Sequence, residues 1–572
     1  MKVNGGQAIA ERLQRHGVRT VFALGGASHS HLLLALADAG VAIVGARHES
    51  GCVGAADGYA RISQRLGVAL IVGEQGLPNA MNGIATAFHA CSAVLVLVAR
   101  LPDSWTEADA EIDGDQLAMV APLVKWARRV PCAARLAEYL DSAAKHALSG
   151  RRGPVVLQIP ADYLGAIVES AASLPTPRLA EPPGPASTAI ASAAGLLAGA
   201  KRPLLIAGAG ACYGGAGAAL RELSERFAIP VAGNGLGRGL LAEDWQHSFN
   251  WPYAQIAACH ADVVCVVGAR LKQRLGFGLP PRFAADARFI QIDIVADEFS
   301  RNRRIDVPIA GNAGRSCEAL LRALASLPGP AAARRDWLGE ALQPRRRFLQ
   351  DLASRPGAAL HPLALGARVA ASNDADAIVV GDGADIQTWM YGAIAVKRAP
   401  GFLDHYPMGA MGSALPLAVG AAAAARDIAR ENGSTARRVM MTTGDGAFGF
   451  YPAELHAAVM AALPLTIVIG NDGAWGTEYH GQMRALGRSV NTELTALDYE
   501  LVARGFGATG HRATTTDELD QALQVAARDA GVQVINALID REAGALLKRE
   551  PLAQMIQFDD LAENVKEQRL EH

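Results

Sequence analysis

The segments Gly444-Asp445-Gly446-Ala447-Phe448 and Asn471-Asp472-Gly473-Ala474-Trp475-Gly476 are the most informative part of this 572-residue chain. Each follows an apolar run typical of a buried strand, at 439–442 and 465–469, and the residues between them have the composition of a helix. The carboxyl ends of neighbouring parallel strands meet at one edge of a sheet, where ligands bind. A single Gly-Asp-Gly is also compatible with an ordinary turn, but its repetition as Asp-Gly after the next strand favours a binding site.

Asp445 and Asp472 place two carboxylates at this predicted sheet edge. Oxygen ligands suit a hard cation such as Mg²⁺, which binds through one or two carboxylates and the phosphates of a substrate. Gly446 and Gly473 have no side chain that would keep a diphosphate away from the backbone. The pattern therefore predicts a magnesium and diphosphate site.

The alternation of short apolar runs and longer Ala- and Leu-rich stretches continues over the whole chain. Continuous apolar strands joined by helices are typical of parallel sheets that are covered on both faces. Two Pro-rich segments, 174–187 and 327–362, have the composition of linkers. We therefore expect an α/β protein of three doubly wound parallel-sheet domains, at residues 1–173, 188–327 and 360–540, followed by a C-terminal tail or lid at 541–572.

The composition excludes several classes of partner. Half of the residues are hydrophobic and 19% are charged, as in an ordinary globular protein. A formal net charge of −2 gives no reason to expect nucleic acid or a membrane surface as partner. The seven scattered cysteines contain no C-x-x-C pair and indicate free thiols in a reducing compartment. With a polar start and no span-length apolar run, a cytoplasmic protein is expected.

The order strand, Gly-Asp-Gly, helix, strand, Asn-Asp-Gly resembles the signature of the thiamine diphosphate-dependent enzymes, such as acetolactate synthase, benzaldehyde lyase and 2-hydroxyacyl-CoA lyase. The resemblance extends over nearly the whole chain, and it implies a pyrimidine-binding, a central Rossmann-like and a diphosphate-binding domain. It implies thiamine diphosphate and Mg²⁺ as cofactors, with the metal held by Asp445, Asp472 and the carbonyl of Ala474. The family usually has asparagine where this chain has Asp472, which adds a negative charge.

The resemblance also implies contacts with the diphosphate half of the cofactor. The residues concerned are Gly383, Ala384, Asp385, Ile386, Gly446, Ala447, Trp475 and Gly476. An acidic side chain at Asp385 suits a phosphate poorly, so we expect contact there through backbone N–H groups.

Glu49, in Arg47-His48-Glu49-Ser50-Gly51, opens a predicted helix after the strand at 41–46. A glutamate in a first helical turn is often only a favourable partner of the helix dipole. The resemblance implies a catalytic role, in which Glu49 hydrogen-bonds the pyrimidine ring and drives it to the imino tautomer that deprotonates the thiazolium carbon.

Met411, in the segment 408–416, matches the apolar residue that the family wedges beneath the cofactor. The resulting V shape brings the imino nitrogen next to the reactive carbon, an effect of proximity. Gly409 would offer its carbonyl to the pyrimidine amino group. The alternative is a Gly-rich turn with a core methionine.

Four further residues are catalytic candidates on the substrate side. Ser28 and His29 have side chains that can hydrogen-bond a substrate oxygen, and Glu111 lies near the position where many relatives have glutamine. His480 matches a histidine of benzaldehyde lyase-like enzymes and would shuttle a proton to an alkoxide. A packing role for His480 is equally compatible with the sequence.

The resemblance implies a carboligase, lyase or decarboxylase that forms or cleaves a C–C bond next to the carbonyl of a 2-keto acid, 2-hydroxyketone or aldehyde. The alternatives are an FAD-containing acetolactate synthase and a non-catalytic cofactor-binding subunit. The Gly-rich turn at 208–214 is weak evidence for a nucleotide, so FAD is possible but not favoured. A homodimer or homotetramer, with active sites at the dimer interface, is implied as well.

Overall fold

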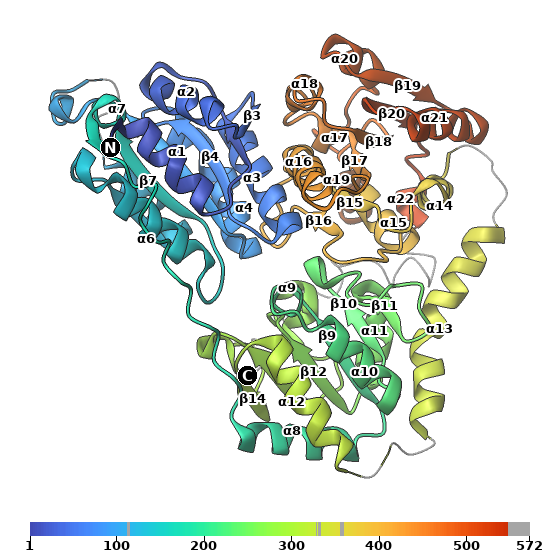
Figure 1. Ribbon diagram of the computed structural model, residues 1–572. Coiled ribbons are helices and arrows are strands. Elements are labelled where there is room, and N and C mark those ends of the chain that lie inside the picture. The colour runs from blue at the N-terminus through green and yellow to red at the C-terminus, as the bar shows by residue number, and fades with distance from the viewer. Residues whose placement is uncertain (111–114, 328, 330–332, 355–359, 547–572) are drawn as a thin grey trace.

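Three six-stranded sheets organise the part of the chain that the structure describes, and neighbouring strands in each are parallel. The structure is a computed structural model and describes residues 1–110, 115–327, 329, 333–354 and 360–546. Figure 1 shows the first domain (blue) beside the third (orange to red), with the second (green) below them. Helices flank each sheet, which confirms the prediction of three doubly wound α/β domains.

The first domain has the strand order β3-β2-β4-β5-β7-β6. Its strands are β2 (Thr20–Ala23), β3 (Ala42–Gly45), β4 (Gly67–Val72), β5 (Val94–Arg100), β6 (Trp126–Arg129) and β7 (Val155–Pro160). The main helices are α1 (Gly5–Arg15), α2 (Ser30–Asp38), α3 (Glu49–Ser63), α4 (Gly76–Ala90) and α6 (Leu136–Leu148). Strands β4 and β5 are almost wholly buried, as their continuous apolar sequences predict.

The second domain has the order β11-β10-β9-β12-β13-β14. Its strands are β9 (Pro203–Ala207), β10 (Val231–Gly233), β11 (Ser248–Asn250), β12 (Val263–Val267), β13 (Arg288–Asp293) and β14 (Val307–Ala310). The main helices are α8 (Ser187–Gly199), α10 (Gly217–Phe227), α11 (Trp251–His260) and α12 (Ala313–Ala325).

The third domain has the order β16-β15-β17-β18-β20-β19. Its strands are β15 (Ile378–Gly381), β16 (Phe402–Asp404), β17 (Val439–Gly444), β18 (Leu465–Asn471), β19 (Thr509–Ala513) and β20 (Val532–Leu538). The helices used below are α15 (Asp385–Ala393), α16 (Ala414–Asn432), α17 (Asp445–Phe448), α18 (Glu454–Met460), α19 (Gly476–Leu486), α21 (Thr516–Arg528) and α22 (Ala543–Leu546). Gly444 of β17 pairs with Gly470 of β18, so Asp445 and Asp472 follow at one sheet edge.

The segment 327–362, which the composition suggests is a linker, contains the long helix α13 (Ala333–Ser354). Figure 1 shows it running along the side of the second domain toward the third. Arg334 donates to the carbonyls of Leu197 and Ala198 at the end of α8, and the indole of Trp337 donates to Pro203. The segment joins the second domain to the third, but it is more ordered than its composition suggests, because side chains of α13 find hydrogen-bond partners on the second domain.

Helices α3 and α16 join the first domain to the third. A Cβ added at Gly420 would lie 1.8 Å from the carbonyl oxygen of Ala55, and one at Gly58 would lie 2.1 Å from that of Leu417. The buried carboxylate of Asp427 accepts hydrogen bonds from Thr20 and Tyr59 across the same contact. The glycines thus permit backbone contact between the two helices. None of the described helices is long and apolar enough to cross a membrane.

Candidate active site

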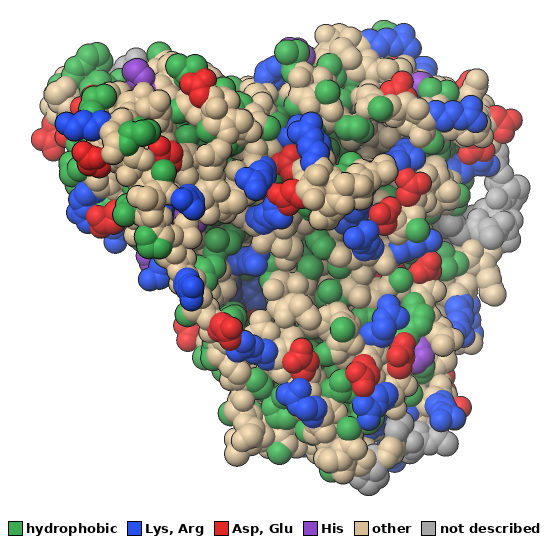
Figure 2. Space-filling model, in the orientation of Figure 1, with side chains coloured by type: hydrophobic (Ala, Val, Ile, Leu, Met, Phe, Trp, Pro, Cys, Tyr) green, Lys and Arg blue, Asp and Glu red, His purple; other side chains and the backbone are tan. Residues whose placement is uncertain are grey.

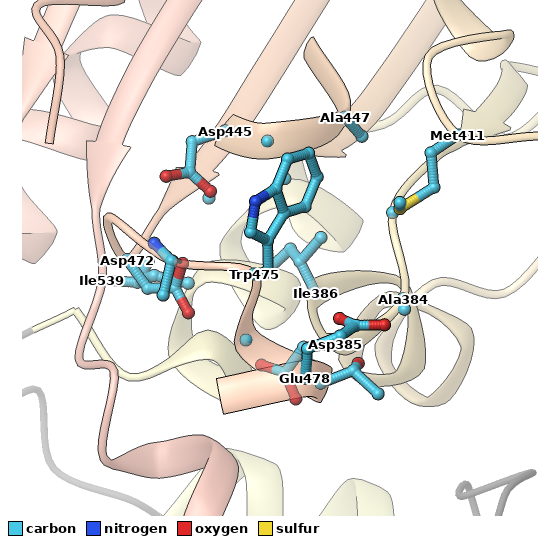
Figure 3. A pocket seen from close by; sticks show the side chains of 17 residues that line it. Ala384, Asp385, Ile386, Met411, Asp445, Ala447, Asp472, Trp475, Glu478 and Ile539 are labelled. Carbon is cyan, nitrogen blue, oxygen red and sulfur yellow. Dashed lines mark hydrogen bonds between the residues drawn. The ribbon is translucent and has the colours of Figure 1, made fainter. Parts of the chain in front are cut away.

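A cavity of about 40 Å³ opens at the carboxyl ends of β15, β17 and β18. Figure 3 shows its side chains, and every described residue that lines it belongs to the third domain. Twelve of the lining residues were singled out in the sequence: Gly383, Ala384, Asp385, Ile386, Met411, Asp445, Gly446, Ala447, Asp472, Ala474, Trp475 and Gly476. Residues from four βα turns, which follow β15, β16, β17 and β18 and lie far apart in the sequence, are therefore brought together.

Asp445 begins α17 directly after β17 and is 2% exposed. Its Oδ2 atom is buried and has no hydrogen-bond partner. Burial, together with the neighbouring Asp472, raises the pKa of Asp445 to about 7. An unpartnered buried carboxylate oxygen is costly unless a cation or a proton occupies it.

Asp472 follows β18, and its Oδ1 accepts the backbone N–H of Ala474 at 3.1 Å. Burial raises the pKa of Asp472, while the Ala474 N–H and the positive charge of Arg541 act in the opposite direction. Gly473 has a positive φ of 65°, which allows the chain to turn sharply between Asp472 and Ala474. The described residues contain no cluster of three or more His, Cys, Asp or Glu side chains arranged for a metal.

Asp385 is the first residue of α15 and lies across the cavity from Asp445 in Figure 3. It is close to Asp472, because a Cβ added at Gly476 would lie 2.9 Å from Asp472 Oδ2 and 3.2 Å from the Asp385 Cβ. Burial and then the charge of Asp472 raise the pKa of Asp385 to about 7. The preceding Asp382 is fully buried, where His405 Nδ1 lies 2.8 Å from its Oδ1 and Ala414 N–H donates to its Oδ2. Asp382 thus ties the turn of Gly383 and Ala384 to the loop that carries Met411.

Trp475 occupies the middle of the cavity, with its indole between Asp445 and Met411 in Figure 3. A Cβ added at Gly446 would lie 2.5 Å from the indole ring, so only glycine fits beneath it. Met411 enters from the opposite loop, where Gly409 and Gly412 both have positive φ. Gly409 does not line the cavity in the described chain. Its N–H donates to His405, and its carbonyl accepts from Met411 at 3.1 Å.

Glu49 begins α3 and is 6% exposed. Its Oε2 accepts from Asn79 Nδ2 at 3.2 Å, and a Cβ at Gly76 would lie 3.3 Å from its Oε1. The carboxylate of Glu454, from α18, accepts the N–H groups of Arg47 and His48, both at 3.0 Å, and so fixes the start of this helix. Glu49 does not line the third-domain cavity of its own chain.

The structure does not bring the substrate-side candidates Ser28 and His29 into the third-domain cavity of their own chain. Ser28 Oγ donates to the carbonyl of Ala99, and the buried His29 accepts the N–H of Gly26 at Nε2. Burial lowers the pKa of His29, and its Nδ1 has no partner. Neither residue lines the third-domain cavity. Glu111 lies outside the described residues.

His480, on α19, lies beside the cavity rather than in its lining. Its Nε2 donates to the main-chain carbonyl of Arg541 at 2.9 Å, just before α22. A Cβ at Gly544 would lie 2.4 Å from the His480 ring, so α22 packs closely on it. The structure therefore gives His480 a packing contact.

A second cavity, of about 410 Å³, lies at the Gly-rich turn 208–214 of the second domain. Basic side chains surround it, namely Arg61, Arg151, Arg152, Arg270, Lys272 and Arg274. Sequence reasoning singled out the turn but missed the cavity, because these basic residues come from both the first and the second domain, and the third domain contributes further lining residues such as Phe402 and Tyr406. Ile539 of the first cavity was missed because an apolar residue at a strand end resembles any core residue.

The sequence matches three models of thiamine pyrophosphate enzymes. The N-terminal TPP binding domain matches residues 3–119, the central domain residues 190–320 and the C-terminal TPP binding domain residues 382–537. Thiamine pyrophosphate and thiamine diphosphate are two names for one cofactor. The three matches follow the order of the three sheets and together cover most of the chain. The protein belongs to the thiamine pyrophosphate enzyme family.

Several relatives within this family match almost end to end. The acetolactate synthase large subunit of Mycobacterium tuberculosis is 31% identical over 554 residues, which cover 94% of this chain and 96% of the relative. Oxalyl-CoA decarboxylase of Escherichia coli is 30% identical over 564 residues (95% and 96%), and mouse 2-hydroxyacyl-CoA lyase 1 is 28% identical over 563 (95% of each). The chain is a thiamine pyrophosphate-dependent enzyme that forms or cleaves a carbon–carbon bond.

Proposed function

We propose that the third-domain cavity binds the diphosphate of thiamine diphosphate together with Mg²⁺. The observation that carries this proposal is the buried Asp445 Oδ2, which has no partner and lies in a cavity shared with Asp472. Asp445, Asp472 and the Ala474 carbonyl would supply three oxygen ligands, and a diphosphate would supply others. Backbone N–H groups at the starts of α15 and α17 would bind phosphate oxygens.

When bound, thiamine diphosphate supplies a carbon nucleophile for a carbonyl group and accepts the electron pair of the bond that breaks. Glu49 would hold a proton at a pyrimidine ring nitrogen, with Asn79 fixing its other oxygen. Met411 would support the cofactor from below. His29, whose neutral form is favoured by burial, would offer its free Nδ1–H to a substrate oxygen.

The substrate class follows from this chemistry: a 2-keto acid, a 2-hydroxyketone or an aldehyde, each with a carbonyl next to the bond that changes. Two relatives are named for acyl-CoA substrates, so CoA thioesters join the candidates. The test is NMR product analysis after incubation with cofactor, Mg²⁺ and pyruvate, with and without an aldehyde acceptor. A hydroxyketone, acetolactate or acetaldehyde supports the proposal, whereas failure to bind thiamine diphosphate contradicts it.

Acetolactate synthesis with FAD is the second candidate. It is favoured by the 31% identical relative and by the second cavity, which is large and basic enough for an anionic nucleotide. Arg274 lines this cavity, packed 3.4 Å over the ring of Tyr406. Flavin absorbance in the purified protein, or flavin uptake on titration, tests this candidate, and colourless protein that ignores FAD contradicts it.

We further propose that the enzyme is a homodimer or homotetramer whose active sites combine two chains. Glu49 lies outside the cavity of its own chain, so its catalytic role requires a cavity on a neighbouring subunit. All seven cysteines are free, which suits a cytoplasmic enzyme. Light scattering that finds only monomers at micromolar concentration contradicts the assembly.

A further inference from the structure

Arg541 lies after β20, where the chain returns to the cavity. Its guanidinium donates to the main-chain carbonyls of Asp472 and Gly473, both at 2.9 Å. It also pairs with the exposed Glu493 at 3.1 Å, and it lies over the ring of Tyr479. Arg541 therefore contacts the turn that carries Asp472 and Ala474, and it does not itself line the cavity.

The turn has other support that does not depend on Arg541. The N–H of Leu494 donates to the Gly473 carbonyl, and Trp475 N–H donates to Thr492 at 2.8 Å. Asn471 Oδ1 accepts the N–H of Gly473 at 3.2 Å. Because the backbone is already held from both sides, a cationic side chain at this place has a function beyond closing the turn.

The charge of the cavity indicates that function. Four acidic side chains line it, namely Asp385, Asp445, Asp472 and Glu478, and no lysine or arginine does so within the described chain. Such a lining repels a diphosphate, and one Mg²⁺ offsets only part of the charge. The guanidinium of Arg541 lies against the main chain of the same turn, directly behind the carboxylate of Asp472. The Glu493 pair is exposed to solvent and therefore screened, so it cancels little of the Arg541 charge.

We propose that Arg541 is a positioning residue whose positive charge offsets that of Asp472, so that an aspartate at this metal-ligand position remains compatible with binding of the cofactor diphosphate. This inference rests on the proposed function. If Arg541 acts in this way, the loss of cofactor affinity on removing its charge depends on the charge at residue 472. A purely structural role of Arg541 would produce no such dependence.

A double-mutant cycle on the full-length protein tests the inference. Thiamine diphosphate affinity at saturating Mg²⁺ is measured by calorimetry for the wild type, Arg541→Gln, Asp472→Asn and the double variant. We expect Arg541→Gln to weaken binding about tenfold when residue 472 is aspartate, and less than about threefold when it is asparagine. Arg541→Lys, which keeps the charge, should recover most of the loss.

Arg512 provides a matched control, since it is an exposed arginine of the same domain that pairs with the exposed Asp498 and with the buried Glu500. Arg512→Gln should leave cofactor affinity unchanged, and thermal unfolding checks that each variant is folded. An equal loss from Arg541→Gln in both backgrounds, or no recovery with Arg541→Lys, overturns the inference. A wild-type protein that binds no thiamine diphosphate instead overturns the proposed function and the inference with it.

Discussion

Buried carboxylates define the chemistry at the scale of single residues. Glu49 and Asp445 are buried and Asp385 and Asp472 are partly buried, yet within the described residues none of the four forms an ion pair with a lysine or arginine. Buried acids without such partners are destabilising and are retained mainly where function needs them. Asp445 and Asp472 share one cavity, whereas Glu49 lies in a different domain with Asn79 as its partner.

Glu49→Gln should lower turnover by about 100-fold or more, because glutamine cannot hold the ring proton as a carboxylate does. Exchange of the thiazolium C2 proton for deuterium, followed by NMR, should slow in parallel, while thiamine diphosphate affinity changes little. Glu222→Gln, on the exposed face of α10, is the control and should behave as wild type. Exchange at the normal rate in Glu49→Gln would remove the residue from the mechanism.

Metal affinity should rise with pH. Burial and Asp472 raise the pKa of Asp445 to about 7, so below that pH a proton must leave before a cation can bind. In the absence of thiamine diphosphate, Mn²⁺ affinity measured by electron paramagnetic resonance should rise about tenfold per pH unit below 7 and level off above it. Asp445→Asn should abolish this dependence, whereas the control substitution Asp517→Asn, at an exposed position of α21, should not. Equal affinity at pH 6 and pH 8 would contradict the assignment.

At the scale of secondary-structure elements, the βα turns of the third domain position the cavity, and the contact between α3 and α16 holds the first domain against the third. The turns that form most of the cavity follow β15, β17 and β18, which are neighbours in the sheet, and the segments after β16 and β20 on either side add Met411 and Ile539. Helices α3 and α16 approach until backbone touches backbone at Gly58 and Gly420. Glu49 begins α3, so the same helix that joins the two domains also carries the catalytic candidate.

Gly420→Ala should destabilise the protein by about 1–3 kcal/mol or more, because the new methyl group would lie 1.8 Å from the Ala55 carbonyl oxygen. Gly195→Ala is the matched control, since it is an exposed glycine inside α8 with nothing within 4 Å of an added Cβ. It should stabilise the helix by about 0.5–1 kcal/mol. Thermal unfolding midpoints measure both, and an unchanged midpoint for Gly420→Ala would show that the helices can separate at no cost.

At the scale of the whole molecule, the question is which chain supplies each half of the site. Figure 2 shows the face of the three-domain molecule seen in Figure 1, with acidic and basic side chains interspersed over it. This mixture accords with the small formal net charge of the chain. The cavity is lined by the third domain alone in the described chain, while Glu49 belongs to the first.

Mixing two inactive variants tests whether sites combine two chains. Glu49→Gln and Asp445→Asn each inactivate every site of a homodimer. Random pairing of the two chains makes about half of the dimers mixed, and each mixed dimer carries one intact site if Glu49 and Asp445 come from different subunits. Co-expression should therefore restore about a quarter of wild-type activity. No recovery, with mixed dimers verified by mass spectrometry, would place both residues in one chain's site.

The sequence alone determined the class of fold and most of the cavity lining. Apolar strands, Ala-rich helices and the Asp-Gly pairs after β17 and β18 are local signals, and parallel strand order then brings these turns to one edge. The sequence likewise identified the start of α3 at Glu49. Such features are predictable because strand periodicity and turn composition depend only on residues near one another in the chain.

The features that depend on residues distant in the sequence became visible only in the folded chain. The basic cavity of the second domain draws side chains from three domains, α13 lies where proline suggested a linker, and His480 packs against the chain at Arg541. Arg541 itself carries no local signal, since its importance comes from two carbonyls about 70 residues earlier. Burial and charge pairing are set by packing between segments, which no periodicity within one segment encodes.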